Sequence, residues 1–170
     1  MNVADLRMIY DYNYWARDRI LAAAARVSPE QYAAPADYPY GGLRGTLLHI
    51  LDAEKSWLHQ WEHGSWTPDL LEADYPTLGM LQEAWGQEEA AMRAFLAHLT
   101  EDDLGRIVRY PVEGGMMRER LLWHCMLHLA NHGTQHRAEA AALLTSFGQS
   151  PGDVDMTLFL NEAGLSPTAA

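Results

Sequence analysis

Four long segments of the sequence carry apolar residues at helical spacing, and this pattern limits the fold more than any other feature. The segments cover about 2–27, 43–63, 77–99 and 118–147. Apolar residues recur in each of them every three or four positions, which places these residues on one face of a helix. Amphipathic helices of this length need one another to bury their apolar faces. The sequence therefore predicts an all-α fold, a four-helix bundle.

Residues that stop or start helices set the limits of these segments. They are Ser28, Pro29, Gly64, Thr77 and Gly148. A short C-terminal helix is expected over about 155–163. The connectors 28–42, 64–76 and 100–117 are long for a bundle, and 106–118, which contains adjacent glycines, has the pattern of a hairpin.

The composition is that of an ordinary globular protein with a single domain over residues 1–170. The chain is 48% hydrophobic and 21% charged. A chain of this length buries roughly 70% of its unfolded surface. The net charge of −11 would repel nucleic-acid phosphates, so a nucleic-acid partner is not expected.

Cysteine use and the lack of a long apolar run bear on location. Cys125 is the single cysteine, so an intramolecular disulfide is excluded. The N-terminal residues lack the apolar stretch of a signal peptide. No apolar run reaches the roughly 18 residues of a membrane span. We expect a cytoplasmic protein that does not enter a membrane.

Four of the eight histidines lie one helical turn apart in the last long segment. A rotation of about 100° per residue places His136 about 40° and His132 about 80° from the centre of the apolar face. His128 and His124 lie at about 120° and 160°, so they face away. Only His132 and His136 are therefore candidates for the interior of the bundle.

Histidines at positions i and i+4 of a helix can bind one metal ion together. Hydrogen-bonded core histidines and surface histidines are the alternatives for His132 and His136. A third ligand from another helix would favour the metal. His49 is the best candidate, because it flanks the apolar face of the second segment. His59, His63 and His98 are expected at the solvated surface.

Several other polar residues fall on apolar faces. Asn13 and Glu54 do so most clearly, and burial without a partner would be costly for either. They either form a polar network within the bundle or hydrogen-bond to the imidazoles and fix their orientation. For Glu88 and Glu89 the network is favoured. Asp52 is an alternative ligand or supporting group, although a solvated position is favoured.

The cysteine and the large aromatic residues are expected to serve packing, and several enzyme classes are excluded because their motifs are missing from the sequence. Cys125 has the position of a small buried hydrophobic residue. Gly133 follows His132 where a zinc protease of the His-Glu-x-x-His type needs glutamate. The sequence has no glycine-rich phosphate loop and no Gly-x-Ser-x-Gly elbow. The large aromatic residues are expected in the core and at its rim: Tyr10, Tyr12, Tyr14, Trp15, Trp57, Trp61, Trp85 and Trp123.

Four stretches in order form a specific set. They are 12–16 (YNYWA), 47–57 (LLHILDAEKSW), 128–137 (HLANHGTQHR) and 150–155 (SPGDVD). Together they resemble the motifs of the DinB/YfiT-like family of metalloenzymes, over nearly the whole chain. The resemblance implies an up-down-down-up four-helix bundle, a homodimer, and a divalent metal held by His49, His132 and His136. Ala138-Glu139 departs from the usual Gly-Gln, which puts a family role for position 139 in doubt.

Three imidazoles would leave one coordination position of a tetrahedral ion open, as in catalytic zinc sites. An ion of this kind, with zinc or nickel favoured, serves hydrolysis or transfer of a low-molecular-weight thiol. We expect a metal-dependent enzyme with a small-molecule substrate, in stress response or detoxification. The alternatives are a non-catalytic metal-binding dimer and a helical bundle without metal.

Overall fold

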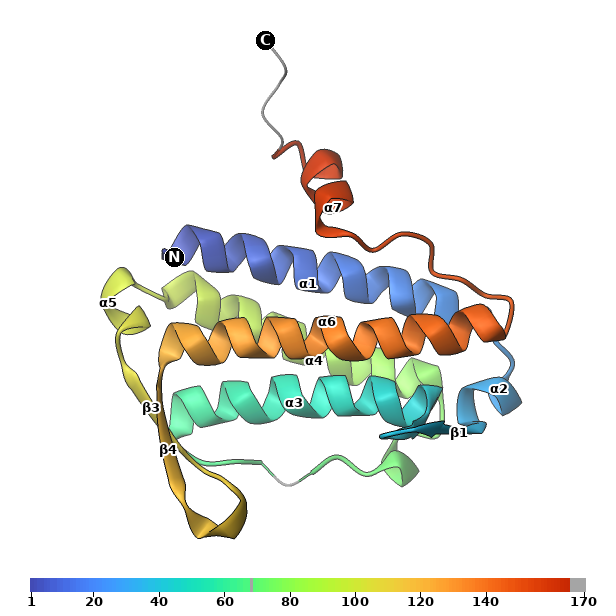
Figure 1. The fold of residues 1–170 in the computed structure, drawn as a ribbon, viewed down its shortest axis with the longest axis horizontal. Coiled ribbons are helices and arrows are strands. Elements are labelled where there is room, and N and C mark those ends of the chain that lie inside the picture. The colour runs from blue at the N-terminus through green and yellow to red at the C-terminus, as the bar shows by residue number, and fades with distance from the viewer. Residues whose placement is uncertain (68, 166–170) are drawn as a thin grey trace.

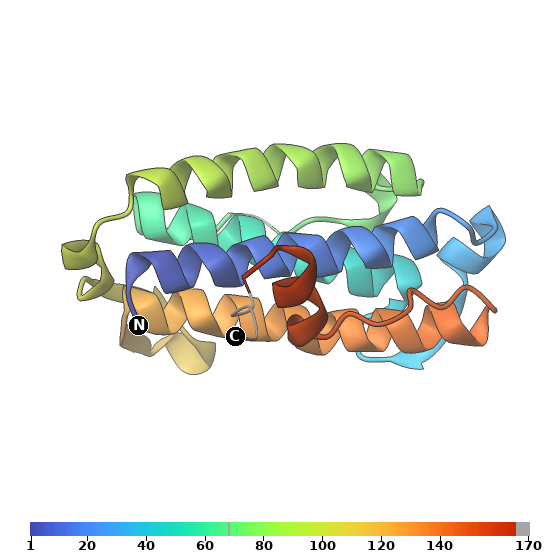
Figure 2. The ribbon, with the colours of Figure 1, turned by 90° about the horizontal axis from the view of Figure 1, so that it is seen from above.

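Four long helices form the body of the molecule in the computed structural model, which describes residues 1–67 and 69–165 (Figures 1 and 2). They are α1 (Val3–Ala24), α3 (Leu43–His63), α4 (Leu78–His98) and α6 (Leu122–Ser146). In Figure 1, α1 and α6 run from left to right, whereas α3 and α4 run from right to left. The predicted mostly helical fold is confirmed. The exact bundle topology stays a prediction, with which these directions are consistent.

Short elements occupy the three long connectors and the C-terminal segment. They are α2 (Pro29–Ala33), β1 (Pro35–Tyr38), β2 (Gly41–Gly42), η1 (Glu72–Asp74), α5 (Glu101–Leu104), β3 (Ile107–Pro111), η2 (Glu113–Gly115), β4 (Met117–Leu121) and α7 (Met156–Glu162). The strands form two separate antiparallel pairs, β1 with β2 and β3 with β4. In Figure 1 the β3–β4 hairpin extends below the left end of the bundle.

Helix ends follow the local capping signals closely. The Asn2 side chain accepts a hydrogen bond from the Asp5 backbone and forms a capping box that starts α1. Gly64 ends α3 in the left-handed conformation, with φ 72°. Thr77 caps α4, as the sequence predicts. α1 ends at Ala24, three residues before the predicted limit, because the chain turns there.

The start of α6 differs more from its prediction. Residues 118–121 were expected to be helical, but they belong to β4 and pair with β3, with Val108 opposite Arg120. This ladder satisfies the backbone polar groups that a helix would otherwise pair. The hairpin expected within 106–118 is present, and it extends to Leu121, so α6 begins only at Leu122.

Two hydrophobic clusters fill the bundle, one toward each end. Leu6, Trp61 and Met126 belong to the first, and Leu47 and Leu144 to the second. Buried polar residues lie on the helices between the two clusters. They include Asn13, Arg17, Glu54, His136 and Arg137. We call this middle layer the polar belt.

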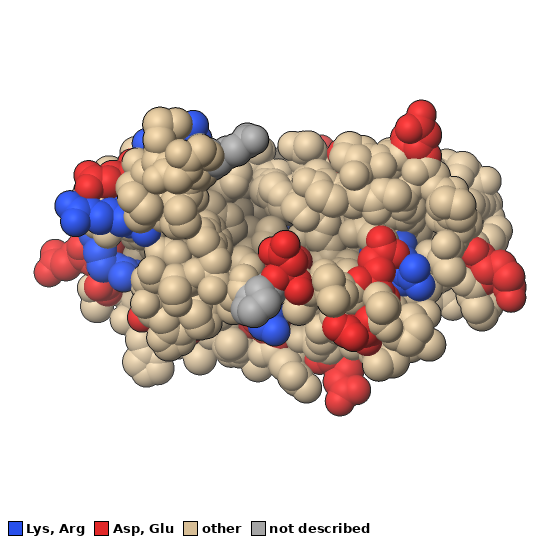
Figure 3. Space-filling view, turned by 90° about the horizontal axis from the view of Figure 1, so that it is seen from below, with Lys and Arg blue, Asp and Glu red and all other residues tan. Residues whose placement is uncertain are grey.

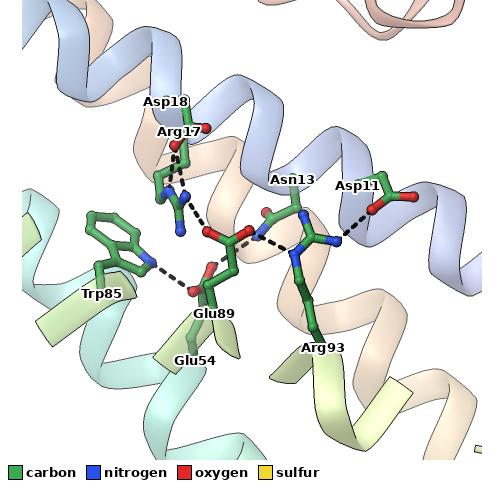
Figure 4. A network of polar contacts seen from close by, with 8 residues as sticks. All are labelled: Asp11, Asn13, Arg17, Asp18, Glu54, Trp85, Glu89 and Arg93. Carbon is green, nitrogen blue, oxygen red and sulfur yellow. Dashed lines mark hydrogen bonds and ion pairs between the residues drawn. The ribbon is translucent and has the colours of Figure 1, made fainter. Parts of the chain in front are cut away.

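The polar belt links all four long helices, and Figure 4 draws its contacts among α1, α3 and α4. The Asn13 amide donates a hydrogen bond of 2.9 Å to Glu54, and Trp85 Nε1 donates one of 2.7 Å to the other oxygen of Glu54. Arg137 donates to the oxygen of Asn13. The structure therefore supports the network interpretation for Asn13 and Glu54 rather than direct contact with the imidazoles. Burial raises the pKa of Glu54, while its hydrogen bonds and nearby arginines oppose the rise.

A second part of the polar belt lies between α1 and α4. Glu89 pairs with Arg17 and with Arg93, and Arg93 also pairs with Asp11 (Figure 4). The two guanidinium groups lower the pKa of Glu89 against the effect of burial. Glu89 thus has the network role that the sequence favours. Burial raises the pKa of Glu88 to about 7.

Candidate metal centre

Three histidines from two helices meet in the middle layer of the bundle. His49 comes from α3, and His132 and His136 come from consecutive turns of α6. One ligand nitrogen of each lies within 4.8 Å of those of the other two. The Nε2 atoms of His49 and His132 are 2.9 Å apart. The structure brings together all three residues named from the sequence.

Helical spacing and close helix packing produce this convergence. His132 and His136 are four residues apart, so their rings lie on the same side of α6, with centroids 4.5 Å apart. The ring of His49 lies 4.8 Å from that of His132 and 4.7 Å from that of His136. His136 is 4% exposed, whereas His49 and His132 are partly exposed. The group therefore opens from the core toward the surface.

Glu139 supports the buried member of the group. Its Oε2 lies 2.8 Å from Nδ1 of His136, one turn further along α6. Because the carboxylate accepts this bond, Nδ1 of His136 donates and Nε2 is left free. A carboxylate in this position fixes the orientation of a metal-ligating imidazole. At position 139, where the sequence departs from the family pattern, the structure thus places a carboxylate against His136.

Tyr40 covers His49 from the other side, which sequence reasoning missed. Its ring stacks on the ring of His49, with centroids 3.5 Å apart and an angle of 11°. The ring of His136 lies nearly perpendicular to the same tyrosine ring, with centroids 5.2 Å apart and an angle of 84°. Tyr40 lies in the turn between β1 and β2, and no helical period predicts where a turn residue lies. Pro39 and the Gly41-Gly42 pair are the local signals of a tight turn there.

The electrostatics of the group favour neutral imidazoles. Burial, followed by the nearby His136, lowers the pKa of His49 to about 4. The same causes lower the pKa of His132 to about 3. Neutral imidazole is the form that binds metal ions. Among the described residues, the buried Nδ1 of His132 has no hydrogen-bond partner. The donor set therefore fits a divalent ion that accepts nitrogen ligands.

Asp52 and the other histidines lie outside this group. The carboxylate of Asp52 accepts a hydrogen bond of 2.9 Å from the backbone of Leu70 and ties the connector after α3 to that helix. It is half-buried, and burial raises its pKa, so Asp52 is less exposed than the solvated position that the sequence favours. His128 is exposed, and its ring lies 6.0 Å from that of His132. His63, His98 and His124 are exposed and His59 is partly exposed.

Within residues 1–67 and 69–165, none of the helices combines the length and the apolar character that crossing a bilayer requires.

Comparisons with known proteins agree with the motifs and the geometry. The model of the DinB family matches residues 1–168. Protein DinB of Bacillus subtilis (strain 168) is 19% identical over 161 residues, which cover 89% of this chain and 91% of that protein. The range matched by the family model spans all four long helices. The chain belongs to the DinB family.

Proposed function

We propose that His49, His132 and His136 bind a divalent metal ion and that the protein is a metal-dependent enzyme. One observation carries the proposal: one nitrogen from each of the three histidines, on two different helices, lies within 4.8 Å of the other two. Zinc and nickel are favoured, because both accept imidazole ligands readily.

The residues around the three histidines would prepare them for this role. Glu139 holds the proton on Nδ1 of His136, which keeps Nε2 available as a donor. Tyr40 stacks on His49 and restricts the rotation of its ring. When bound, an ion with three protein ligands would keep one position open and act as a Lewis acid.

Thiol transfer and hydrolysis are the two reactions that such a centre serves. In thiol transfer the nucleophile would come from a low-molecular-weight cosubstrate, because the protein itself offers no reactive thiol. Cys125 is buried, and burial raises its pKa to about 11. A homodimer, a cytoplasmic location, a small-molecule substrate and a role in stress response or detoxification complete the proposal. The homodimer and the role in stress response or detoxification rest on the family resemblance, whereas the cytoplasmic location rests on the single cysteine and the N-terminal residues.

Metal analysis of purified protein tests the ligand set. Alanine at His49, His132 or His136 should abolish stoichiometric metal binding, whereas His124→Ala, on the exposed side of the same helix, should leave it intact. Undiminished metal in all three ligand variants would overturn the assignment. Size-exclusion chromatography with light scattering tests the dimer.

Activity assays separate the two reactions from a non-catalytic role. The metal-loaded protein is assayed with thiol cosubstrates and electrophiles, and in parallel with ester and amide substrates. Activity that disappears on chelation and returns with metal supports the enzyme. Inactivity of the fully loaded protein in both series would favour the alternative, a metal-binding bundle without catalysis.

A further inference from the structure

Aromatic side chains continue the metal centre along α3. Trp57 lies two turns after His49, and its ring contacts the rings of Trp66 and Tyr110, with centroids 4.9 Å and 5.0 Å away. His128 joins the same group from α6, with its ring 5.7 Å from that of Trp57. We call Trp57, Trp66, Tyr110 and His128 the aromatic wall.

The aromatic wall adjoins the candidate metal centre directly. The ring of His128 lies 6.0 Å from that of His132, so His128 stands between the metal centre and Trp57. Figure 3 shows the face that carries these elements: it is hollowed between the β3–β4 hairpin on the left and the middle of the molecule. Uncharged residues surround most of the hollow. A molecule held there would meet mostly uncharged residues.

The members of the wall remain partly accessible to solvent. Trp57, Trp66 and Tyr110 are half-buried, and His128 is exposed. Three large rings that contact one another at the surface present a combined apolar patch, and patches of this kind mark binding sites. Aromatic rings also favour other aromatic rings in edge-on or offset contact.

Polar contacts also help to hold β3 and the connector after α3 in place. Gln60 Nε2 donates a hydrogen bond of 2.8 Å to the backbone of Arg109 and so ties β3 to α3. Ser56 and Thr67, whose hydroxyl oxygens are 2.9 Å apart, tie the connector that carries Trp66 to the same helix. The hairpin and the connector therefore have polar anchors in addition to ring packing, because Trp57 and Tyr110 also pack against the first hydrophobic cluster. Only the partly exposed parts of the rings are open to a ligand.

We propose that the aromatic wall binds a planar, uncharged aromatic group of the substrate and directs the rest of the substrate toward His132. The inference rests on the proposed function, because it names the substrate class of the same centre. It differs from packing alone in one respect: loss of a ring should change the affinity for a planar ligand.

Isothermal titration calorimetry of the metal-loaded protein tests the proposal with a matched pair of probes. The first is 2-naphthalenemethanol, which is planar, and the second is its fully saturated decahydro analogue of similar size. We expect the planar probe to bind with one-to-one stoichiometry and severalfold more tightly than the saturated one. Trp66→Leu and Tyr110→Leu should each weaken binding of the planar probe roughly tenfold.

Trp15→Leu is the matched control. Trp15 is a half-buried tryptophan of α1 that contacts Phe159 of α7, outside the aromatic wall. This variant should bind the planar probe as the unmodified protein does. If Trp66→Leu and Tyr110→Leu lower the thermal stability but leave affinity unchanged, the rings serve packing alone and the proposal is wrong.

A further variant separates this inference from the metal assignment. His49→Ala removes a proposed ligand but leaves the wall in place, so it should lose metal and still bind the planar probe. Retained binding supports the wall even if the metal assignment fails. Absence of probe binding to the metal-loaded, unmodified protein would overturn the wall and leave the metal assignment standing.

Discussion

The Nε2 atoms of His49 and His132 lie 2.9 Å apart, although 83 residues separate the two histidines in the chain. Two protonated imidazoles at this separation would repel each other strongly. Burial is the main cause that lowers the pKa values of both groups well below the ordinary 6.5, and the nearby His136 lowers them further. The pair is therefore held as neutral rings, and the fold bears the cost when acid protonates them.

Acid should destabilise the metal-free protein through this pair. As the pH falls below about 6.5, the unfolded chain binds protons at both histidines. The folded protein does not bind them until about pH 4 at His49 and about pH 3 at His132. Protons thus favour the unfolded state, and the free energy of unfolding should fall as the pH drops from 6.5 toward 4. Urea unfolding of chelator-treated protein across this range measures the effect.

His49→Ala provides the comparison for this pH experiment. Other groups titrate in the same range: the Glu88 carboxyl has its pKa raised to about 7, so its contribution to stability is lost as pH rises instead. The informative quantity is therefore the difference in the free energy of unfolding between the unmodified protein and the His49→Ala variant at each pH. The variant should show a shallower fall below pH 6.5. If the free energy of unfolding fell equally steeply with pH in the two proteins, His49 would not be the source of the acid sensitivity.

Glu139 should tune metal affinity without being a ligand. Removal of the partner of a ligating imidazole typically weakens metal binding by roughly 10–100-fold, and Glu139→Ala should do so. Glu139→Gln should lose less, because its amide oxygen still accepts a bond from Nδ1 of His136. Competition with a chelator measures the affinities, with Glu83→Ala on the exposed side of α4 as the control. Unchanged affinity in Glu139→Ala would show that the contact plays no part in binding.

Gly133 makes room for the polar belt. An added Cβ at this position would lie 2.7 Å from Arg137 Nη1 and 3.0 Å from Asn13 Oδ1. Gly133→Ala should therefore disturb this buried hydrogen bond and cost about 1–3 kcal/mol of stability, partly offset by a gain of about 1 kcal/mol in helix propensity.

Gly86→Ala is the matched control for this substitution. Gly86 also lies within a long helix, and an added Cβ there meets nothing within 4 Å. It should stabilise the protein by up to about 1 kcal/mol. Urea unfolding compares the two variants. An equal gain in both would mean that the polar belt adapts to the extra methyl group without loss.

The long helices were predictable because each carries its own evidence. Apolar spacing marks the buried face, and Gly64 and Thr77 mark helix ends locally. The same rotation that separates the faces of α6 selected His132 and His136 and set His124 aside. The hairpin was harder to delimit: residues 118–121 continue the helical spacing, but pairing with β3 is a non-local contact that local pattern does not contain.

Which residues share a helix face can be read from the sequence, because the direction of side chains along a helix follows from the 3.6-residue repeat. Which side chains on different helices and turns contact one another depends on the tertiary structure. Tyr40 reaches His49 through a turn, and Asn13 pairs with Glu54 rather than with an imidazole. Glu139 lies within one turn of His136, but its hydrogen bond to that histidine depends on the burial of both side chains. Such pairings depend on how helices pack and on which polar groups lose water together, and periodicity alone specifies neither.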